Sequence, residues 1–442
     1  MEKVCVLGLG YIGLPTAAIF ATHGLRVVGV DVDEGVLRSL EAGNLKFPEP
    51  GLSALVQTAL GSGNLRLARR PEVADTFVIA VPTPLSRRTG AAEGQVQAPA
   101  ADLSYVVSAA ESIVPYLRPR NLVVLESTVP PGTIANVLVP ILERSGLPVS
   151  GRAVPSQESP IYVAHCPERV LPGRILCEIV HNDRVIGGVD TASSEMAREL
   201  YATFVKGEIL LTDATTAELV KLMENAYRDV NIALANEFAL VAESVGVDVW
   251  EAIALANRHP RVSILSPGPG VGGHCIAVDP WFIVEAAPQV TRLIRAAREV
   301  NDSMPAHVVA MVKKAMVGRT GAVVGCLGLA YKANVGDLRE SPALKVVELL
   351  RREGFEVRAF DPYVWPSAAL DGLLRPTLDE TVDEADCVVI LTDHKDFRSL
   401  TLSQLGPRPV AIVDARNVLS DCRGSSRYVA LGCSKSRHDR CS

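Results

Sequence analysis

The stretch from Ser266 to Pro280 carries the strongest chemical signal in this sequence. It reads SPGPGVGGHCIAVDP, so four glycines and two prolines precede a single cysteine, Cys275, and Asp279 follows four residues later. Neither a helix nor a strand needs such a backbone, whereas a loop that presents a thiolate to a substrate does. Asp279 could hold a water molecule or act as a base, and His274 could favour the thiolate or merely shape the loop. A buried cysteine in a structural loop is the alternative.

Three polar residues upstream of this loop are spaced as neighbours on one helix face. Lys221, Asn225 and Arg228 stand at positions i, i+4 and i+7 in a run, residues 212–246, whose apolar residues also recur with helical spacing. A helix of about 30 residues is on the order of 45 Å long, a length typical of helices that link domains or pack against a partner subunit. A lysine and an amide one turn apart can donate to one oxygen, which suits an oxyanion or a hydroxyl that loses its proton. A solvated face with a Glu224–Arg228 pair is the alternative.

A glycine-rich turn stands near the start of the chain. Residues 8–13 read GLGYIG, after an apolar run over 3–7 that predicts a buried strand and before an apolar helical run to Thr22. Asp31 closes the next predicted strand, 18 residues after Gly13. Such glycines permit a close approach of a pyrophosphate, which the helix N-terminus stabilises, and the carboxylate would accept hydrogen bonds from ribose hydroxyls. A carboxylate there repels a 2′-phosphate, so the motif favours NAD over NADP; a turn that binds no nucleotide is the alternative.

Further polar residues follow predicted strands. VPTP (81–84) and ESTVPPGT (126–133) each end a strand-like run, so Thr83 and Thr128 could contact a cofactor or a catalytic water. Polar and cationic residues also stand after strand-like runs of the C-terminal third or just before the cysteine loop: His259, Arg261, Tyr331, Lys332, Arg339 and Arg416. Cations at strand ends suit an anionic group such as a diphosphate. Structural turns and surface charges are the alternatives.

The elements that must position these residues alternate between strand and helix in two separate regions. Strand-like runs cover residues 3–7, 25–31, 76–81, 121–127 and 152–154 in the first region, and 321–330, 355–362, 386–394 and 411–419 in the second. We therefore predict an α/β fold with two Rossmann-like doubly wound sheet domains, joined by a central helical segment with one long helix. The expected domains are residues 1–205, 206–305 and 306–422, followed by a frayed tail, 423–442, with no assignable function.

Two local patterns add to this outline. Residues 84–101 are rich in glycine, alanine, proline and arginine, which predicts a surface loop. Residues 215–218, TTAE, form the pattern of a capping box at the start of the long helix.

Composition excludes several classes of protein. The 442 residues include 48% hydrophobic and 21% charged residues, as in a globular chain long enough for several cores. The formal net charge of −6 argues against a general binder of nucleic acid or anionic membranes. No apolar run approaches the ~18 residues of a membrane span, and the start shows no basic leader, so a cytoplasmic protein is expected. Nine cysteines without a CxxC pair predict neither a disulfide scaffold nor a metal site.

Taken together, these motifs resemble those of the UDP-glucose/GDP-mannose dehydrogenase family. The likeness covers nearly everything but the tail and rests on GLGYIGLP, VPTP, ESTVPPGT, CPERVLPG, AELVKLMENAYRD, GPGVGGHC, LAYKANVGDLRES and DARN, in that order. It implies the four-electron oxidation of a sugar C6 alcohol to a carboxylate, with two NAD⁺ consumed per turnover. A thiohemiacetal on Cys275 would allow the second hydride to leave, and the resulting thioester would then be hydrolysed. The resemblance also implies a homodimer built on the long helix.

The resemblance assigns a role to each matching position. Cys275 would be the nucleophile, and Lys221 and Asn225 would hold the C6 oxygen, with Lys221 also able to transfer a proton. The hydrolytic water would be ordered or activated by Asp279, Thr128 and Glu168. NAD contacts are implied for Gly8, Gly10, Tyr11, Ile12, Gly13, Asp31, Thr83, Thr128 and Arg339. Substrate contacts are implied for Arg169, Val170, Lys221, Asn225, Arg228, His259, Arg261, Gly272, Tyr331, Lys332 and Arg416. The segment around His259 is implied to reach a neighbouring subunit's site.

Departures from the family pattern narrow the substrate. Members that act on UDP-glucose carry Ser before the catalytic cysteine and Phe-Pro-Lys-Asp after it, whereas this chain has His274 before it and IAVD, residues 276–279, after it. The missing lysine and the added histidine favour a 2-acetamido sugar. Residues 268–284 resemble the subgroup that oxidises UDP-N-acetyl-D-mannosamine, and UDP-N-acetyl-D-glucosamine is the alternative substrate.

Two more distant hypotheses belong to other classes. A two-electron 3-hydroxyacid dehydrogenase shares the N-terminal sheet and the Lys-x-x-x-Asn helix, but it has no loop cysteine and no second sheet domain. A catalytically silent nucleotide-sugar-binding protein would not need the full set of reactive residues that this sequence carries.

Overall fold

The chain folds into two compact units. The computed structural model describes residues 1–442 apart from 46, 48, 87–97, 153–158, 172, 318, 320, 407, 420, 421, 423, 424 and 434–442. One unit consists of Met1–Glu224 with Trp281–Pro288, and the other of Asn225–Pro280 with Gln289–Ser442. Two helices, α8 (Ala214–Val245) and α10 (Asp279–Ala286), contribute residues to both units.

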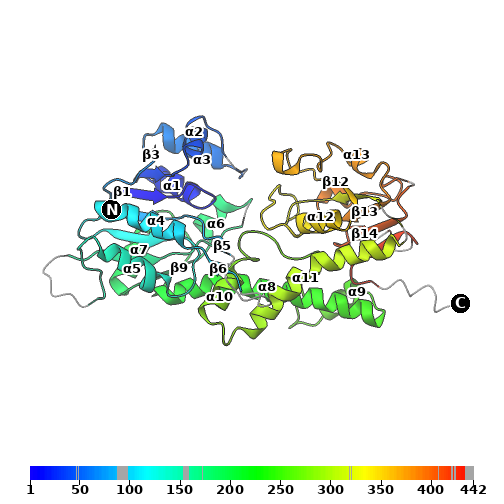
Figure 1. Cartoon of the computed structure of the whole chain (residues 1–442). Helices are drawn as coiled ribbons and strands as arrows, with labels where there is room; N and C mark the ends of the chain where they lie inside the picture. Colours follow the sequence, from blue (N-terminus) through cyan, green and yellow to red (C-terminus); the bar gives the residue numbers. More distant parts are fainter. Residues whose placement is uncertain are drawn as a thin grey trace. The chain divides into compact units, whose positions relative to one another are not determined.

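The first unit is built on a sheet that has eight strands among its described residues (Figure 1), in the order β10-β9-β8-β7-β4-β1-β2-β3. Neighbouring strands in this part of the chain are parallel except β8 and β9, which are antiparallel. The strands are β1 (Lys3–Leu7), β2 (Arg26–Val30), β3 (Leu65–Ala68), β4 (Thr76–Ile79), β7 (Leu122–Leu125), β8 (Tyr162–His165), β9 (Arg184–Gly188) and β10 (Ile209–Asp213). The strands predicted at 3–7, 25–31, 76–81 and 121–127 are confirmed as β1, β2, β4 and β7.

Helices cover both faces of this sheet, as a doubly wound fold requires. Val4 and Val6 of β1 join one buried cluster, while the alternate residues Cys5 and Leu7 join another on the opposite face. The first cluster contains residues of α1 (Gly13–Thr22), α2 (Glu34–Glu41), α3 (Leu52–Gly61), α6 (Ile175–His181) and α7 (Thr191–Tyr201). The second contains α4 (Ser104–Ile113), the π-helical turn Ile134–Leu138 and α5 (Val139–Glu143). Burial on both faces explains why the strands read as continuous apolar runs.

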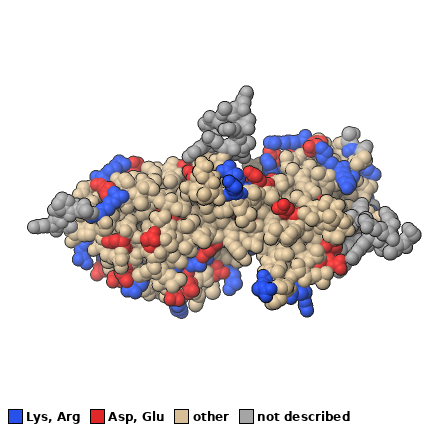
Figure 2. All heavy atoms as spheres, turned by 90° about the horizontal axis from the view of Figure 1, so that it is seen from below, with Lys and Arg blue, Asp and Glu red and all other residues tan. Residues whose placement is uncertain are grey.

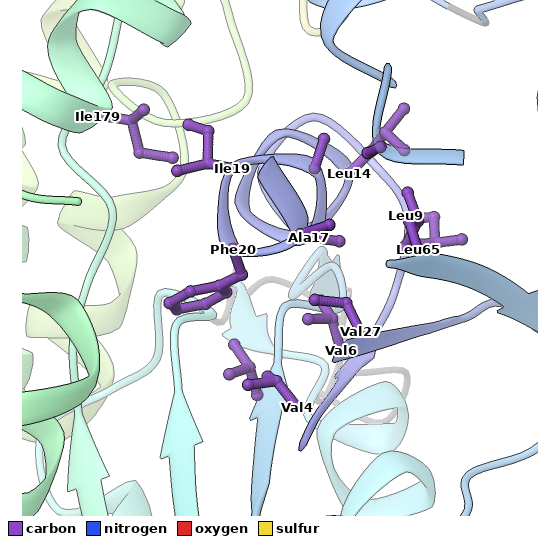
Figure 3. Packing of buried hydrophobic residues seen from close by; sticks show 14 of the residues in the cluster. Val4, Val6, Leu9, Leu14, Ala17, Ile19, Phe20, Val27, Leu65 and Ile179 are labelled. Atoms are coloured by element: carbon purple, nitrogen blue, oxygen red, sulfur yellow. The ribbon is translucent and has the colours of Figure 1, made fainter. Parts of the chain in front are cut away.

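Helix α1 is apolar on every side because it is packed on every side. Figure 3 shows Ala17 and Phe20 directed toward the sheet, where Val6 lies, while Ile19 on another side of the helix faces Ile179 of α6. All of these side chains are buried. The packing fixes the start of α1, and with it the glycine-rich turn that leads into the helix.

The second unit carries a parallel sheet of five strands among its described residues, in the order β12-β11-β13-β14-β15 (Figure 1). The strands are β11 (Val323–Leu327), β12 (Glu356–Phe360), β13 (Cys387–Ile390), β14 (Ala411–Asp414) and β15 (Tyr428–Ala430). Its helices are most of α8, then α9 (Val249–Ala256), α11 (Arg292–Ala315), α12 (Pro342–Arg352) and α13 (Leu378–Val382). The four strands predicted for this region are confirmed as β11–β14, and the predicted long helix is confirmed as α8.

The expectation that residues 423–442 form a frayed tail is wrong for the residues described there, 425–433. Strand β15 pairs with β14, and the Tyr428 hydroxyl donates to the buried Asp414 carboxylate at 2.7 Å. Leu431 is fully buried, and its carbonyl accepts a hydrogen bond from Trp250 Nε1 at 2.8 Å. This segment escapes a periodicity argument because a three-residue strand is too short to show a pattern.

Two further expectations meet the structure only in part. The surface loop predicted at 84–101 begins with β5 (Leu85–Ser86) and ends with β6 (Ala100–Ala101), which pair with each other, so its two ends are held together. Its middle, 87–97, and most of the strand predicted at 152–154 lie outside the described residues.

The described residues lack two other kinds of feature. None of the helices described is long and apolar enough to cross a membrane. In the same part of the chain, no group of three or more His, Cys, Asp or Glu side chains is placed to hold a metal ion.

Candidate active site

The glycine-rich turn after β1 shows which glycines the fold itself requires. A Cβ on Gly13 would lie 1.9 Å from Gly8 O, and one on Gly8, where φ is +92°, would lie 2.6 Å from Ala80 O. A Cβ on Gly10 would meet nothing within 4 Å. Gly8 and Gly13 are therefore needed for the turn and its packing, whereas Gly10 leaves open space beside the backbone. Such space fits the close approach of a cofactor pyrophosphate.

Asp31 supports the same turn from the end of β2. Its carboxylate accepts the backbone N–H of Leu9 at 3.0 Å and that of Asp33 at 2.9 Å. The side chain is only partly buried. A negative charge at this position fits the ribose of NAD and disfavours a 2′-phosphate. The predicted cofactor residues at positions 8–13 and Asp31 therefore lie together, and Tyr11 stacks on Phe47 with ring centroids 3.9 Å apart.

The two loops that follow β4 and β7 are bonded to each other. Thr83 is buried, and its hydroxyl donates to the backbone carbonyl of Thr128 at 2.7 Å. The hydroxyl of Ser127 donates to Val81 O at 2.7 Å. The VPTP and ESTVPPGT segments thus form one structure at the carboxyl edge of the sheet, where the sequence predicts Thr83 and Thr128 to act.

Glu168, the predicted catalytic carboxylate, lies in a buried ion pair that the sequence does not predict. Arg184 Nη2 donates to Glu168 Oε2 at 2.8 Å, and both side chains are almost fully buried. Glu126 lies in the same buried region, where burial raises its pKa to about 7 although Arg184 opposes the shift. Glu126 accepts hydrogen bonds from the Tyr201 hydroxyl at 2.6 Å and from the Thr16 hydroxyl at 3.3 Å.

The neighbouring substrate candidate Arg169 is also ion-paired. Its Nη2 lies 2.6 Å from an oxygen of Glu224, and its Nε donates to the other oxygen at 3.1 Å. The Glu224–Arg228 surface pair considered from the sequence is therefore not the main contact of Glu224. Val170, the next substrate candidate, packs partly buried against the core of the first unit.

Glu218 is a further residue whose role the sequence misses. Its carboxylate accepts the backbone N–H groups of Gly132 and Ile134, the latter at 2.8 Å, although 84 residues separate Ile134 from Glu218. Helix α8 is instead capped by Asp213, which accepts the Thr216 N–H at 2.9 Å. The predicted capping box is therefore wrong, because Glu218 satisfies the start of another helix. Burial raises the pKa of Glu218 to about 7.

In the second unit, the structure joins two of the predicted catalytic residues. Asn225 Nδ2 donates to Asp279 Oδ2 at 2.5 Å, and both residues are buried. The backbone N–H of Asp279 donates to the carbonyl of Cys275 at 2.8 Å, which places the cysteine one turn away. Cys275 itself is exposed, as a nucleophile must be. Lys221 is buried one turn before Asn225 on α8, and Arg228 is exposed.

The cysteine loop packs against residues that follow β11. Cβ atoms on Gly272 and Gly273 would lie 2.7 Å and 2.8 Å from side-chain atoms of Tyr331, so only glycines allow this approach. The Gly273 N–H donates to Arg339 O at 3.0 Å. Burial, helped by the charge of Arg339, lowers the pKa of His274. A lowered pKa disfavours a positive charge beside the thiol, so it favours the loop-shaping role of His274 among the two considered.

Buried amides anchor the start of the same loop. Asn236 Oδ1 accepts the Gly268 N–H at 2.8 Å, and Asn236 Nδ2 donates to Asn301 Oδ1 at 2.9 Å. Asn301 in turn donates to the Asp229 carboxylate at 2.8 Å, and that carboxylate is paired with the buried Arg298. Of these four side chains, Asp229 ends the AELVKLMENAYRD motif, whereas Asn236, Arg298 and Asn301 belong to none of the quoted motifs. All four lie on the helices α8 and α11.

The remaining cationic candidates differ in their surroundings. Arg416 Nη2 donates to Asp393 at 2.8 Å, and its guanidinium lies so close to Gly268 that a Cβ there would be 2.4 Å from Nη1. Arg339 forms a double contact with Asp337 at 2.7 and 3.0 Å, and Lys332 is partly buried. His259 and Arg261 are exposed on the segment after α9. Thus Gly272, Tyr331, Arg339 and Arg416 lie around the cysteine loop, while Thr128, Glu168 and Lys221 belong to the first unit.

Comparison with known proteins gives matches along nearly the whole chain. Three domains of the UDP-glucose/GDP-mannose dehydrogenase family match it: the NAD binding domain over residues 2–205, the central domain over 215–303 and the UDP binding domain over 325–421.

Similar proteins with full-length matches carry related names. A UDP-N-acetyl-D-mannosamine dehydrogenase of Methanocaldococcus jannaschii is 50% identical over 95% of this chain and 93% of its own length. An NDP-N-acetyl-D-galactosaminuronic acid dehydrogenase of Ralstonia nicotianae is 47% identical over 95% of this chain and 96% of its own. The structure of a UDP-D-ManNAc dehydrogenase from Pyrococcus horikoshii, 41% identical, superposes with a TM-score of 0.87 over 98% of this chain and 100% of the other.

Proposed function

The chain belongs to the UDP-glucose/GDP-mannose dehydrogenase family, and from that premise we propose that it oxidises the C6 alcohol of UDP-N-acetyl-D-mannosamine to the uronic acid. Family membership makes it an NAD-dependent nucleotide-sugar dehydrogenase. The proposed substrate rests on the names of the similar proteins and on the residues around Cys275. UDP-N-acetyl-D-glucosamine is the alternative substrate.

The observation that supports the chemistry most directly is the contact between Asn225 and Asp279, one turn from Cys275. An amide nitrogen carries two hydrogens, so Asn225 can hold Asp279 with one and the C6 oxygen with the other. An amide fixed in this way donates without reorganising during the reaction.

The proposed first half of the reaction ends in a covalent intermediate. Lys221 takes the proton of the C6 hydroxyl while Asn225 donates to its oxygen. The Cys275 thiolate then forms a C–S bond to the aldehyde carbon, and the aldehyde oxygen takes a proton back from Lys221, which gives a thiohemiacetal. When bound, NAD⁺ accepts the hydride from C6 in each of the two oxidation steps. In the second oxidation the hydroxyl proton of the thiohemiacetal passes again to Lys221, and with the second hydride gone a thioester remains on Cys275.

Hydrolysis completes the proposed sequence. A water oxygen forms a bond to the thioester carbonyl carbon, the C–S bond breaks, and Cys275 leaves as a thiolate. We assign Glu168 as the carboxylate that takes the proton of this water, and Asp279 and Thr128 as the groups that orient it. The product is the sugar carboxylate.

Substrate and cofactor contacts are proposed on the same basis. The glycine-rich turn with Tyr11, Ile12, Asp31 and Thr83 would hold NAD. The residues proposed to contact the nucleotide sugar include Arg169, Val170, Arg228, His259, Arg261, Gly272, Tyr331, Lys332 and Arg416. Arg339 is proposed as a further contact to NAD.

A homodimer through α8 is also part of the proposal. Exposed apolar side chains recur along one side of this helix at spacings of three, four and seven residues: Met223, Tyr227, Leu234, Phe238, Val241 and Val245. Figure 2 views the molecule from the side on which α8 lies in Figure 1, and most of the surface drawn there carries no Lys, Arg, Asp or Glu. An apolar stripe of this length is typical of helices that pack against a partner. Sedimentation of the wild type and of Phe238→Glu would test it.

The test of the activity is the number of NADH molecules formed per UDP-N-acetyl-D-mannosamine consumed. We expect a ratio near two, lost in Cys275→Ala and kept in Cys177→Ala, which removes another exposed cysteine. A ratio near one would mean that oxidation stops at the aldehyde and that the role of Cys275 is wrong. If only UDP-N-acetyl-D-glucosamine is oxidised, the proposed mechanism stands and the proposed substrate is wrong.

A further inference from the structure

Arg184 occupies an unusual place in the first sheet. It is the first residue of β9, which runs antiparallel to β8, with His165 opposite Gly187 and Ala164 opposite Gly188. Among the described strands of this sheet, every other neighbouring pair is parallel. Because β9 is antiparallel to β8, the start of β9 lies at the carboxyl end of β8, where the chain continues into Glu168.

The side chain of Arg184 is held from several directions. Its Nη2 donates to Glu168 at 2.8 Å and to Ile179 O at 3.3 Å. The guanidinium carbon lies 4.9 Å from the ring centroid of Tyr201 and 5.6 Å from that of Phe204. With its side chain only 5% exposed, Arg184 has no room to move independently of these neighbours.

We propose that Arg184 is a positioning residue for the hydrolytic step: its guanidinium fixes the orientation of the Glu168 carboxylate. This inference rests on the proposed function, in which Glu168 accepts the proton of the attacking water. Burying a carboxylate is costly unless it is paired and hydrogen-bonded, and Arg184 supplies both contacts to Glu168.

A second buried carboxylate, Glu126, has different hydrogen-bond partners. The charge of Arg184 also acts on Glu126, but the hydrogen bonds that Glu126 accepts come from the neutral hydroxyls of Tyr201 and Thr16. Burial raises the pKa of Glu126 to about 7, and the charge of Glu168 contributes to this rise. The guanidinium therefore bonds directly to Glu168, whereas Glu126 is held by two hydroxyls.

The proposal concerns one proton. When water adds to the thioester carbon, the C–S bond to Cys275 breaks and the water proton passes to Glu168. If Glu168 is displaced, this transfer fails while the earlier steps, which do not use Glu168, continue. The thioester should then accumulate on Cys275.

The experiment compares Arg184→Met, Arg184→Lys and Glu168→Gln with the wild type. We expect kcat to fall on the order of 10²-fold in Arg184→Met, with a burst of two NADH per site and an acyl adduct on Cys275 seen by intact-protein mass spectrometry. Glu168→Gln should give the same adduct. Arg184→Lys, which keeps the charge but not the planar fork, should show a smaller loss of kcat. The KM for NAD should stay unchanged in all three variants.

Two controls separate positioning from loss of fold. Val106→Ala truncates a fully buried side chain of α4, which packs on the opposite face of the same sheet, so it should lower the melting temperature without an adduct. If Arg184→Met proves insoluble, Arg184→Lys supplies the same comparison. An Arg184 variant that hydrolyses the thioester at the wild-type rate would overturn the inference.

The outcomes also distinguish this inference from the function on which it rests. If the wild type forms no NADH from either sugar nucleotide, the proposed function fails. If the wild type forms two NADH and only Glu168→Gln accumulates the adduct, the function stands and Arg184 has no positioning role.

Discussion

The side-chain amide of Asn225 is bonded to the carboxylate of Asp279, with 2.5 Å between Nδ2 and Oδ2. This contact joins helix α8 to the residue that follows the cysteine loop by one turn. Both residues carry functional roles in our proposal, so the contact ties the group that holds the C6 oxygen to a group that orients water.

Exchanging the two side chains separates the structural effect of the hydrogen bond between Asn225 and Asp279 from the catalytic roles of these residues. In Asn225→Asp two buried carboxylates face each other, so we expect lower stability and a loss of kcat on the order of 10²-fold. Combining Asn225→Asp with Asp279→Asn restores one amide and one carboxylate in reversed positions. The double variant should recover the melting temperature but not kcat. Recovery of kcat as well would show that the positions of the amide and the carboxylate are interchangeable.

The glycine-rich turn predicts opposite outcomes for two similar substitutions. Gly13→Ala places a Cβ 1.9 Å from Gly8 O, so it should cost on the order of 3 kcal/mol of stability or prevent folding. Gly10→Ala meets nothing within 4 Å and should leave the melting temperature unchanged, yet raise the dissociation constant of NAD by about tenfold or more. Thermal unfolding and NADH fluorescence titration measure the two effects. Unaltered NAD binding in Gly10→Ala would place the pyrophosphate elsewhere.

Asn236 should control the loop of Cys275 without touching substrate. Asn236→Asp keeps an acceptor for the Gly268 N–H but sets a carboxylate against Asn301 Oδ1, so the anchor of the loop should loosen. We expect a lower kcat, a changed rate of Cys275 alkylation by iodoacetamide and an unchanged KM for NAD. Asn231→Asp is the matched control, because that amide donates to Tyr227 O within its own helix. Equal effects of the two variants would mean that charge on α8, not the anchor, is responsible.

The sequence predicts the parts of the fold that depend on neighbouring residues. Apolar patterns that extend over enough residues predict the strands around the glycine-rich turn, the long helix and the second alternating region. The cysteine loop can be predicted because several glycines stand close together in its sequence. The structure adds the reason, since Gly272 and Gly273 must pass close to Tyr331.

What escapes the sequence depends on contacts between distant segments. Arg184 carries no motif, and its place beside Glu168 follows from an antiparallel pairing that no local pattern records. Glu218 fits a capping pattern but bonds a turn 84 residues away. Strand β15 is too short to show a periodic pattern of apolar residues. In each case the deciding partner is chosen by tertiary packing.

Glu218 also predicts how stability depends on pH. Burial raises its pKa in the folded chain from 4.5 to about 7, while Asp213 adds to the rise and the N–H groups of Ile134 and Gly132 oppose it. Between these two values the folded state holds a proton that the unfolded state has released. The free energy of unfolding should therefore fall as pH rises from 4.5 to about 7 and level off above that range.

Replacing Glu218 removes this titration and so isolates its contribution. Each unit of pKa difference corresponds to about 1.4 kcal/mol, so the unfolding free energies of wild type and Glu218→Gln should diverge by about 1 to 3 kcal/mol between pH 5 and pH 8. Chemical denaturation at several pH values measures the difference. Glu111→Gln, which changes an exposed carboxylate paired with Arg144, is the control and should run parallel to the wild type. Parallel curves for Glu218→Gln as well would mean that this carboxylate stays ionised in the folded chain, bound by the two N–H groups that it caps.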